Sequence, residues 1–199
     1  MKKLTYYRQK KIKQNLDYYF NLATEKEIKD GKNWYKDANN FCKDAAKKFN
    51  YNVYTVASIL SALSPRNKWE QNKKDCLKVL KAVNGGLNPE QIKVCTFNTN
   101  KFKAFNIAKN KVSLNNTSLK TFNFLNNIAF LCPESVTVDI WHLRACFNKS
   151  IKINNAAIGK IAYKQIKDIT LLKAKKYDLK AYELQAILWL TVQKHYNNK

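Results

Sequence analysis

The sequence predicts an all-α fold of about nine to ten helices, and three observations support this prediction. Glycine and proline, which interrupt helices, are scarce: the 199 residues include 4 Gly and 3 Pro. Apolar residues recur at helical spacing, as in the i, i+3, i+4, i+7 pattern of Ala38, Phe41, Cys42, Ala45 and Phe49. No segment alternates apolar and polar residues as a half-buried strand does, and no repeat period is present.

Local start and stop signals place the individual helices. We expect Gly31 to end the first helix and Asn33 to cap the second. Pro65 disfavours the α conformation of the residue before it, so we expect the third helix to end there. We expect Asp178 to cap the last helix. The expected helices cover residues 4–29, 33–49, 53–63, 67–84, 88–94 and 101–109, two stretches within 114–148, residues 155–167, and a last segment from 178 onward.

The net charge indicates a polyanionic partner. Lys and Arg number 37 against 14 Asp and Glu, a formal charge of +23. A bias toward AT-rich codons would explain the abundance of Lys, but Asp and Glu also have AT-rich codons and are scarce. A field of this sign attracts nucleic acid, so we expect DNA as the partner. The three arginines, Arg8, Arg66 and Arg144, stand out because Arg offers a planar fork of donors that Lys lacks.

Cysteine usage favours a reducing compartment and no metal. The five cysteines are odd in number, widely spaced and without a C-x-x-C pair, so buried thiols are expected. The two histidines do not complete a metal-ligand pattern, and no cofactor is expected. No signal peptide or membrane span is apparent. We therefore expect a cytoplasmic protein, and we expect it to be a monomer. The cysteines are Cys42, Cys76, Cys95, Cys132 and Cys146.

Polar residues surround a tryptophan where the third helix ends and the fourth begins. A helix N-terminus offers free backbone N–H groups to a phosphate, and Arg66 adds a charge. Trp69 is suited to stacking on a base, and the amides of Gln71 and Asn72 to a base edge. The alternative is a core tryptophan beside a solvated polar turn.

A second segment, residues 114–147, places a lysine and an acid at the starts of two successive helices. Lys120 precedes an apolar helix over residues 122–131, and the chain then turns at Cys132-Pro133. Asp139 follows two valines, 136 and 138, nineteen positions after Lys120. Taken alone, Asp139 is a helix N-cap and Lys120 a solvated side chain.

This segment resembles the core of the helix-hairpin-helix (HhH-GPD) DNA glycosylases. Residues 114–121 fall on the family's hairpin, Asp139 on its catalytic aspartate, and Lys120 on the lysine that members with lyase activity use as nucleophile. Residues 57–62 resemble the buried helix that ends in L-L-S-A. The string L-S-P-R-x-x-W-x-x-N and residues 182–189 look like small phage and bacterial members, including relatives implicated in base modification. The resemblance covers about residues 35–195.

The hairpin departs from the family pattern. Asn115, Asn116, Thr117 and Ser118 stand where the family has its proline and glycines. Asn tolerates positive φ and Ser or Thr can cap, so a tight anion-binding turn remains compatible with these residues.

The resemblance implies a two-lobed helical fold with a DNA-binding cleft between the lobes. One lobe would span residues 53–131, and residues 1–50 and 132–199 would form the other, with Lys120 and Asp139 facing each other. The implied function is cleavage of the N-glycosidic bond of a flipped, modified or damaged base, with or without AP-lyase activity. The implied DNA or substrate contacts are Arg66, Trp69, Gln71, Asn72, Asn116, Ser118, Trp141, His142 and Arg144.

Two other functions remain open at this point. One is a phage-type enzyme that uses the same aspartate on hypermodified pyrimidines without excising them. The other is a non-catalytic, basic DNA-binding protein built on the same helices.

Overall fold

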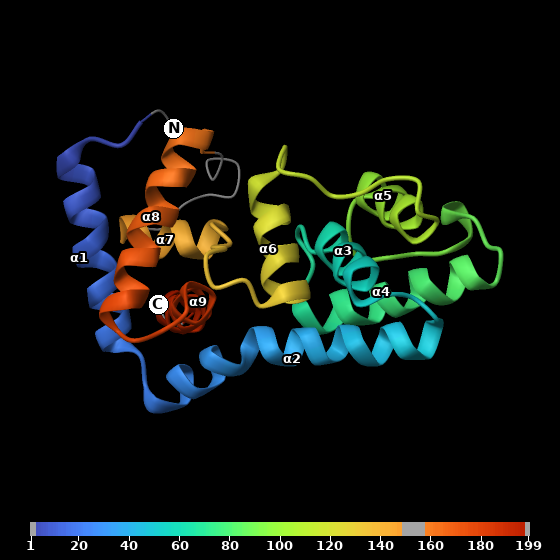
Figure 1. Cartoon of the computed structure of the whole chain (residues 1–199), viewed down its shortest axis with the longest axis horizontal. Helices are drawn as coiled ribbons and strands as arrows, with labels where there is room; N and C mark the ends of the chain where they lie inside the picture. Colours follow the sequence, from blue (N-terminus) through green and yellow to red (C-terminus); the bar gives the residue numbers. More distant parts are fainter. Residues whose placement is uncertain (1–2, 149–157, 198–199) are drawn as a thin grey trace. The chain divides into compact units, whose positions relative to one another are not determined.

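A computed structural model describes residues 3–148 and 158–197 (Figure 1). Over those residues the protein is built from helices without a strand, which confirms the all-α prediction. The elements are α1 (Tyr6–Leu22), α2 (Glu25–Phe49), α3 (Val53–Leu63), α4 (Trp69–Asn84), a 3-10 helix η1 (Pro89–Gln91), α5 (Asn98–Ala108), α6 (Leu119–Phe130), α7 (Ile140–Phe147), α8 (Lys160–Lys176) and α9 (Ala181–Asn197).

The helices group into two compact units. Unit 1 comprises Met1–Asp37 and Leu131–Lys199, and unit 2 comprises Ala38–Phe130. The boundary between Asp37 of unit 1 and Ala38 of unit 2 falls inside α2, whereas the lobe boundary expected from the sequence lies between residues 50 and 53.

Unit 1 has its core among its N-terminal and C-terminal helices. Helix α1 packs against α7, α8 and α9, and α9 also packs against α7 and α8. The buried faces of α1 and α9 supply large apolar side chains, among them Leu16, Tyr19, Leu184 and Leu188.

The expected helix break at Gly31 is wrong, because Gly31 lies inside α2. The break comes earlier, between Leu22 and Glu25, where Thr24 and Glu27 form a reciprocal capping pair: the Thr24 amide donates to the Glu27 carboxylate and the Glu27 amide to the Thr24 hydroxyl. A Cβ atom on Gly31 would lie 2.7 Å from the Ile187 Cα atom. Glycine is therefore required here for close packing of α2 on α9.

Asn33 likewise does not cap a helix. It lies within α2, and its side-chain amide donates to the Lys29 carbonyl oxygen one turn earlier.

Unit 2 is organised around α3. This helix packs against α4, α5 and α6, and its residues from Thr55 to the end are buried. Its bounds confirm the prediction for residues 53–63, because the Asn52 side chain caps the Thr55 amide at 2.7 Å and the helix ends just before Ser64-Pro65. Helix α4 starts at Trp69 and ends at the predicted Gly85-Gly86 turn, where Gly86 has φ +73°.

Two C-terminal predictions need correction. Helix α8 runs from Lys160 to Lys176, later and longer than the expected 155–167, of which residues 155–157 lie outside the described part. Asp178 does not cap the last helix, since it occupies the left-handed region (φ 52°) of the turn after α8. The start of α9 is instead held by Glu183, whose carboxylate accepts from the Lys180 amide at 2.9 Å.

The cysteines form no disulfide in the described part of the chain. Cys42, Cys76 and Cys146 are buried, as expected, and burial raises the pKa of the Cys42 thiol to about 12. Cys95 is exposed and Cys132 half-buried, so these two differ from the expectation. No described helix is long and apolar enough to cross a membrane.

Candidate functional site

Asp139 lies at the N-terminus of α7, and hydrogen bonds hold the residues that lead up to it. The three residues before it are buried, and the Asp139 amide donates to the Thr137 carbonyl at 3.1 Å in a tight turn. The Tyr163 hydroxyl of α8 donates to the Val136 carbonyl at 2.8 Å and accepts from the Val138 amide at 3.2 Å. The Asp139 carboxylate accepts from the His142 amide at 2.8 Å, which caps α7. Asp139 itself is half-buried, so its carboxylate combines fixed geometry with partial access to solvent.

His142 lies in the core of unit 1, with 0% of its surface exposed. Its Nε2 atom is 2.9 Å from the Thr170 hydroxyl, which in turn donates to the Ile166 carbonyl. Because that hydroxyl proton is used, His142 must donate from Nε2 and carry the lone pair on Nδ1. Burial lowers the pKa of the ring to about 4, so it is neutral at pH 7. The structure therefore places this predicted pocket residue between α7 and α8 rather than at the surface.

Trp141 and Arg144 are brought together on α7. The guanidinium carbon of Arg144 lies 4.2 Å from the centre of the Trp141 ring and 5.6 Å from that of Tyr196 on α9. Both predicted residues are half-buried. The cation lies within reach of two aromatic rings, and Arg144 belongs to the last turn of the helix that Asp139 caps.

In unit 2, the turn between α3 and α4 holds the second predicted group. Arg66 is exposed, has φ 57° and stacks its guanidinium over Phe97 at 5.1 Å. Trp69 is half-buried, with the Lys73 ammonium 5.8 Å from a ring centre. Asn72 is buried and donates to the Leu60 carbonyl at 3.0 Å, so its amide ties α4 to α3.

A buried carboxylate that sequence reasoning missed holds this turn together. Asp75 has 0% of its surface exposed and accepts from the side chains of Asn67 (3.0 Å) and Gln71 (2.8 Å) and from the Cys95 amide (2.8 Å). The signal in the sequence was an acid directly before Cys76 on the apolar face of α4. Gln71 therefore bonds within the protein in this structure.

The predicted hairpin lies at the surface of unit 2. Asn116, Ser118 and Lys120 are exposed. Asn115 forms a tight turn, because its side-chain oxygen accepts from the Thr117 amide at 3.1 Å and hydroxyl at 2.6 Å. Lys120 lies in the first turn of α6 in unit 2, whereas Asp139 belongs to unit 1. That Lys120 and Asp139 face each other therefore stays a prediction.

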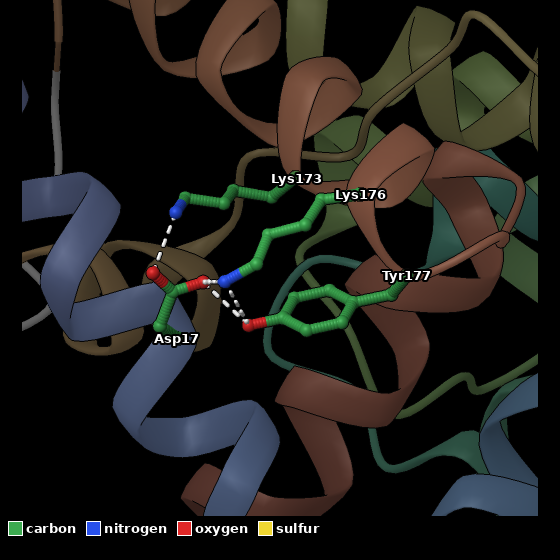
Figure 2. Close-up of polar contacts among 4 residues, drawn as sticks. All are labelled: Asp17, Lys173, Lys176 and Tyr177. Atoms are coloured by element: carbon green, nitrogen blue, oxygen red, sulfur yellow. Dashed lines mark hydrogen bonds and ion pairs between the residues drawn. The ribbon is translucent and has the colours of Figure 1, made fainter.

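An ionic cluster joins α1 to α8 in unit 1 (Figure 2). Asp17 accepts from Lys173 at 2.6 Å, from Lys176 at 3.2 Å and from the Tyr177 hydroxyl. Burial alone would raise the pKa of Asp17, but these three hydrogen bonds outweigh it and leave the pKa below its usual value. The cluster neutralises the nearly buried Lys173 and clamps the two helices together.

The longest acid-free stretch of the sequence is residues 91–133. Residues 91–133 contain six lysines and no Asp or Glu, and five of those lysines are exposed. Within the described residues, no group of three His, Cys, Asp or Glu side chains is arranged to hold a metal ion. The described site residues therefore offer carboxylate, amine and aromatic chemistry.

These features define a strongly basic, all-α protein with a half-buried carboxylate fixed at a helix N-terminus. The chain belongs to the family described as "Family of unknown function (DUF7178)", which it matches over residues 1–196. No curated protein and no solved structure matches the chain.

Proposed function

We propose that this protein is a DNA glycosylase that cleaves the N-glycosidic bond of a flipped, modified or damaged base. The observation that carries the proposal is the placement of Asp139. The residues before this carboxylate are buried and bonded to Tyr163, and the carboxylate itself caps a helix, so it is held in one position relative to its surroundings. The resemblance of residues 114–147 to the glycosylase core supplies the reaction class.

In the proposed reaction, Asp139 acts on the charge that develops as the base departs. The base leaves with the bonding electron pair, and positive charge grows on the anomeric carbon of the sugar. A fixed carboxylate stabilises that charge and accepts the proton of an attacking water, which leaves an abasic site. In the lyase form of the proposal, the neutral amine of Lys120 attacks the same carbon, and the resulting Schiff base permits strand cleavage.

Charge supports DNA as the substrate. The formal charge is +23, and the acid-free stretch of residues 91–133 presents exposed lysines suited to phosphates. The proposal includes the two-lobed glycosylase fold with a DNA cleft that the resemblance implies. It also includes a monomer acting in the cytoplasm of a bacterial cell or a phage-infected host, where such DNA occurs.

A second candidate function is DNA binding without catalysis. One observation favours it: the Asp139 carboxylate accepts from the His142 amide, a bond that a purely structural N-cap also makes. A third candidate, action on hypermodified pyrimidines without excision, uses the same carboxylate and differs only in its products.

The test compares wild type with Asp139→Asn on genomic DNAs, unmodified and carrying modified pyrimidines. Asparagine keeps the helix cap and removes the charge, so the variant should fold normally. Asp168→Asn, on an exposed ion pair of α8, is the matched control. Released bases and abasic sites are measured by mass spectrometry, and borohydride trapping reports a Schiff base.

Base release by wild type and Asp168→Asn that is lost in Asp139→Asn supports the glycosylase. Altered bases without release support the non-excising enzyme. Salt-sensitive DNA binding by all three proteins with no change in any base would sink both enzyme proposals in favour of the binding protein.

A further inference from the structure

We infer that an open depression beside α5 in unit 2 binds an unpaired nucleotide of a single-stranded nucleic acid. The depression has a volume of about 680 Å³ and is lined by α5 and the segment that follows it. In Figure 1 these are the green helix α5 and the loop leading on toward α6. This inference shares the nucleic-acid partner with the proposed function but does not depend on Asp139.

An exposed aromatic ring supplies the platform. Phe102 is 40% exposed and Val112 is 44% exposed, and both line the depression. The core of α5 does not need the Phe102 ring, since the helix buries its other face through residues such as Phe105. A surface phenyl ring in an aqueous depression is suited to stacking against the face of a base, an interaction that every base can make.

A cation lies beside the ring. The Lys101 ammonium lies 5.9 Å from the Phe102 ring centre and donates to the Ile92 carbonyl at 3.0 Å, so it is a fixed cation beside the ring. Lys101 is almost fully buried, which limits its movement. A platform whose neighbour is fixed loses little conformational entropy on binding.

Polar groups around the ring match a nucleotide. The amides of Asn98 and Asn106 and the hydroxyl of Ser113 line the same depression and offer both donors and acceptors to a base edge. Lys103 also lines it and offers its ammonium to a phosphate. The depression therefore combines stacking, hydrogen-bonding and ionic groups.

The surroundings favour a polyanion over an apolar peptide. The segment after α5 folds back so that the Lys111 amide donates to the Asn106 carbonyl at 2.8 Å, and Lys109 and Lys111 are exposed there. The residues that line the depression include one lysine, Lys103, and no Asp or Glu that would repel a phosphate. Charge complementarity therefore selects nucleic acid as the occupant.

The experiment measures binding of short, labelled oligothymidylate and oligouridylate by fluorescence anisotropy, with a duplex of equal length alongside. Phe102→Leu keeps the apolar bulk and removes the ring, whereas Phe102→Trp keeps an aromatic face. Phe130→Leu, at a 62% exposed phenylalanine of the same unit that does not line the depression, is the matched control.

We expect Phe102→Leu to weaken binding of the single strand about tenfold, and Phe102→Trp and Phe130→Leu to stay within about twofold of wild type. Duplex binding should change little in Phe102→Leu, because paired bases are not free to stack on the ring. Lys103→Gln should lower the slope of affinity against salt by about 0.7. A preference between the two oligonucleotides would identify DNA or RNA as the source of the strand.

Wild-type affinity in Phe102→Leu, or an equal loss for duplex and single strand, would overturn the inference. Photo-crosslinking of 5-iodouracil in the bound strand should label the peptide that contains Phe102, and labelling confined to other peptides would also overturn it. The readout is binding alone and needs no Asp139 variant, so failure of the glycosylase proposal leaves this test intact.

Discussion

The Tyr163 hydroxyl donates to the Val136 carbonyl at 2.8 Å and accepts from the Val138 amide at 3.2 Å. It thereby bridges the backbones of two residues that are two positions apart in the sequence. A single side chain on α8 thereby holds the buried segment that leads to Asp139. The Tyr35 hydroxyl of α2 adds to this from within the same unit, since it donates to Gln185 at 2.8 Å and lies 3.2 Å from the Thr137 hydroxyl. The position of Asp139 thus depends on helices far from it in sequence.

Tyr163→Phe should destabilise the protein by about 1–3 kcal/mol, because it leaves a buried carbonyl and a buried amide without their hydrogen-bond partner. Urea unfolding measures the change. Tyr7→Phe is the control. Because Tyr7 is 75% exposed, the unfolding free energy of this variant should stay within about 0.5 kcal/mol of wild type. Equal stability of Tyr163→Phe and wild type would show that the bridge is energetically neutral.

Stability should fall as pH is lowered from about 6.5 to 4, because of His142. The pKa of the buried ring is about 4, below its ordinary 6.5, so in this range the unfolded chain takes up a proton that the folded protein does not. The stabilisation is complete above pH 6.5 and should decrease by roughly 3 kcal/mol toward pH 4. Urea unfolding across this range tests the slope.

His142→Gln should flatten this slope, and His195→Gln, at the chain's other histidine, should retain it. A slope that persists in His142→Gln would assign the pH dependence to other groups. Asp17 acts in a lower window, since its depressed pKa means that its stabilisation is lost only as pH falls below about 3.8.

Asp17→Asn should cost about 1–3 kcal/mol, because it leaves the ammonium of the nearly buried Lys173 without its anionic partner. The loss is kept moderate by the partial exposure of Asp17. Asp168→Asn breaks an exposed pair with Lys164 at a similar distance and should change the unfolding free energy by less than about 0.5 kcal/mol. Thermal or urea unfolding of the two variants gives the comparison, and similar values for both would refute the clamp.

Gly31→Ala should destabilise unit 1 by about 3 kcal/mol, because the new methyl group would meet the backbone of Ile187 at 2.7 Å and the helices must move apart. Gly85→Ala is the control: its nearest neighbour would be the Lys81 carbonyl at 3.4 Å, an ordinary contact. Calorimetric unfolding should show a lower melting temperature for Gly31→Ala only. A melting temperature of Gly31→Ala equal to that of wild type would argue against the steric explanation.

Local signals were sufficient at some of the helix boundaries. Asn52, Pro65 and the Gly85-Gly86 pair act through their own backbone and nearest neighbours, and the predicted ends of α3 and α4 match them. Gly31 carried the same local signal as a helix stop, but its role is set by Ile187, more than 150 residues away. In the sequence alone, a glycine that ends a helix looks the same as a glycine at a close contact between two helices.

For the candidate site, the sequence by itself determined the helical class, the basic charge and the capping role of Asp139, because each follows from composition or from residues within one turn. Only the tertiary structure decided that His142 and Asp75 are buried and that Phe102 lines a depression. Burial depends on which distant helices cover a side chain. Contacts between residues far apart in the chain, as between Tyr163 and Val136, are therefore what gives this protein the geometry of its candidate site.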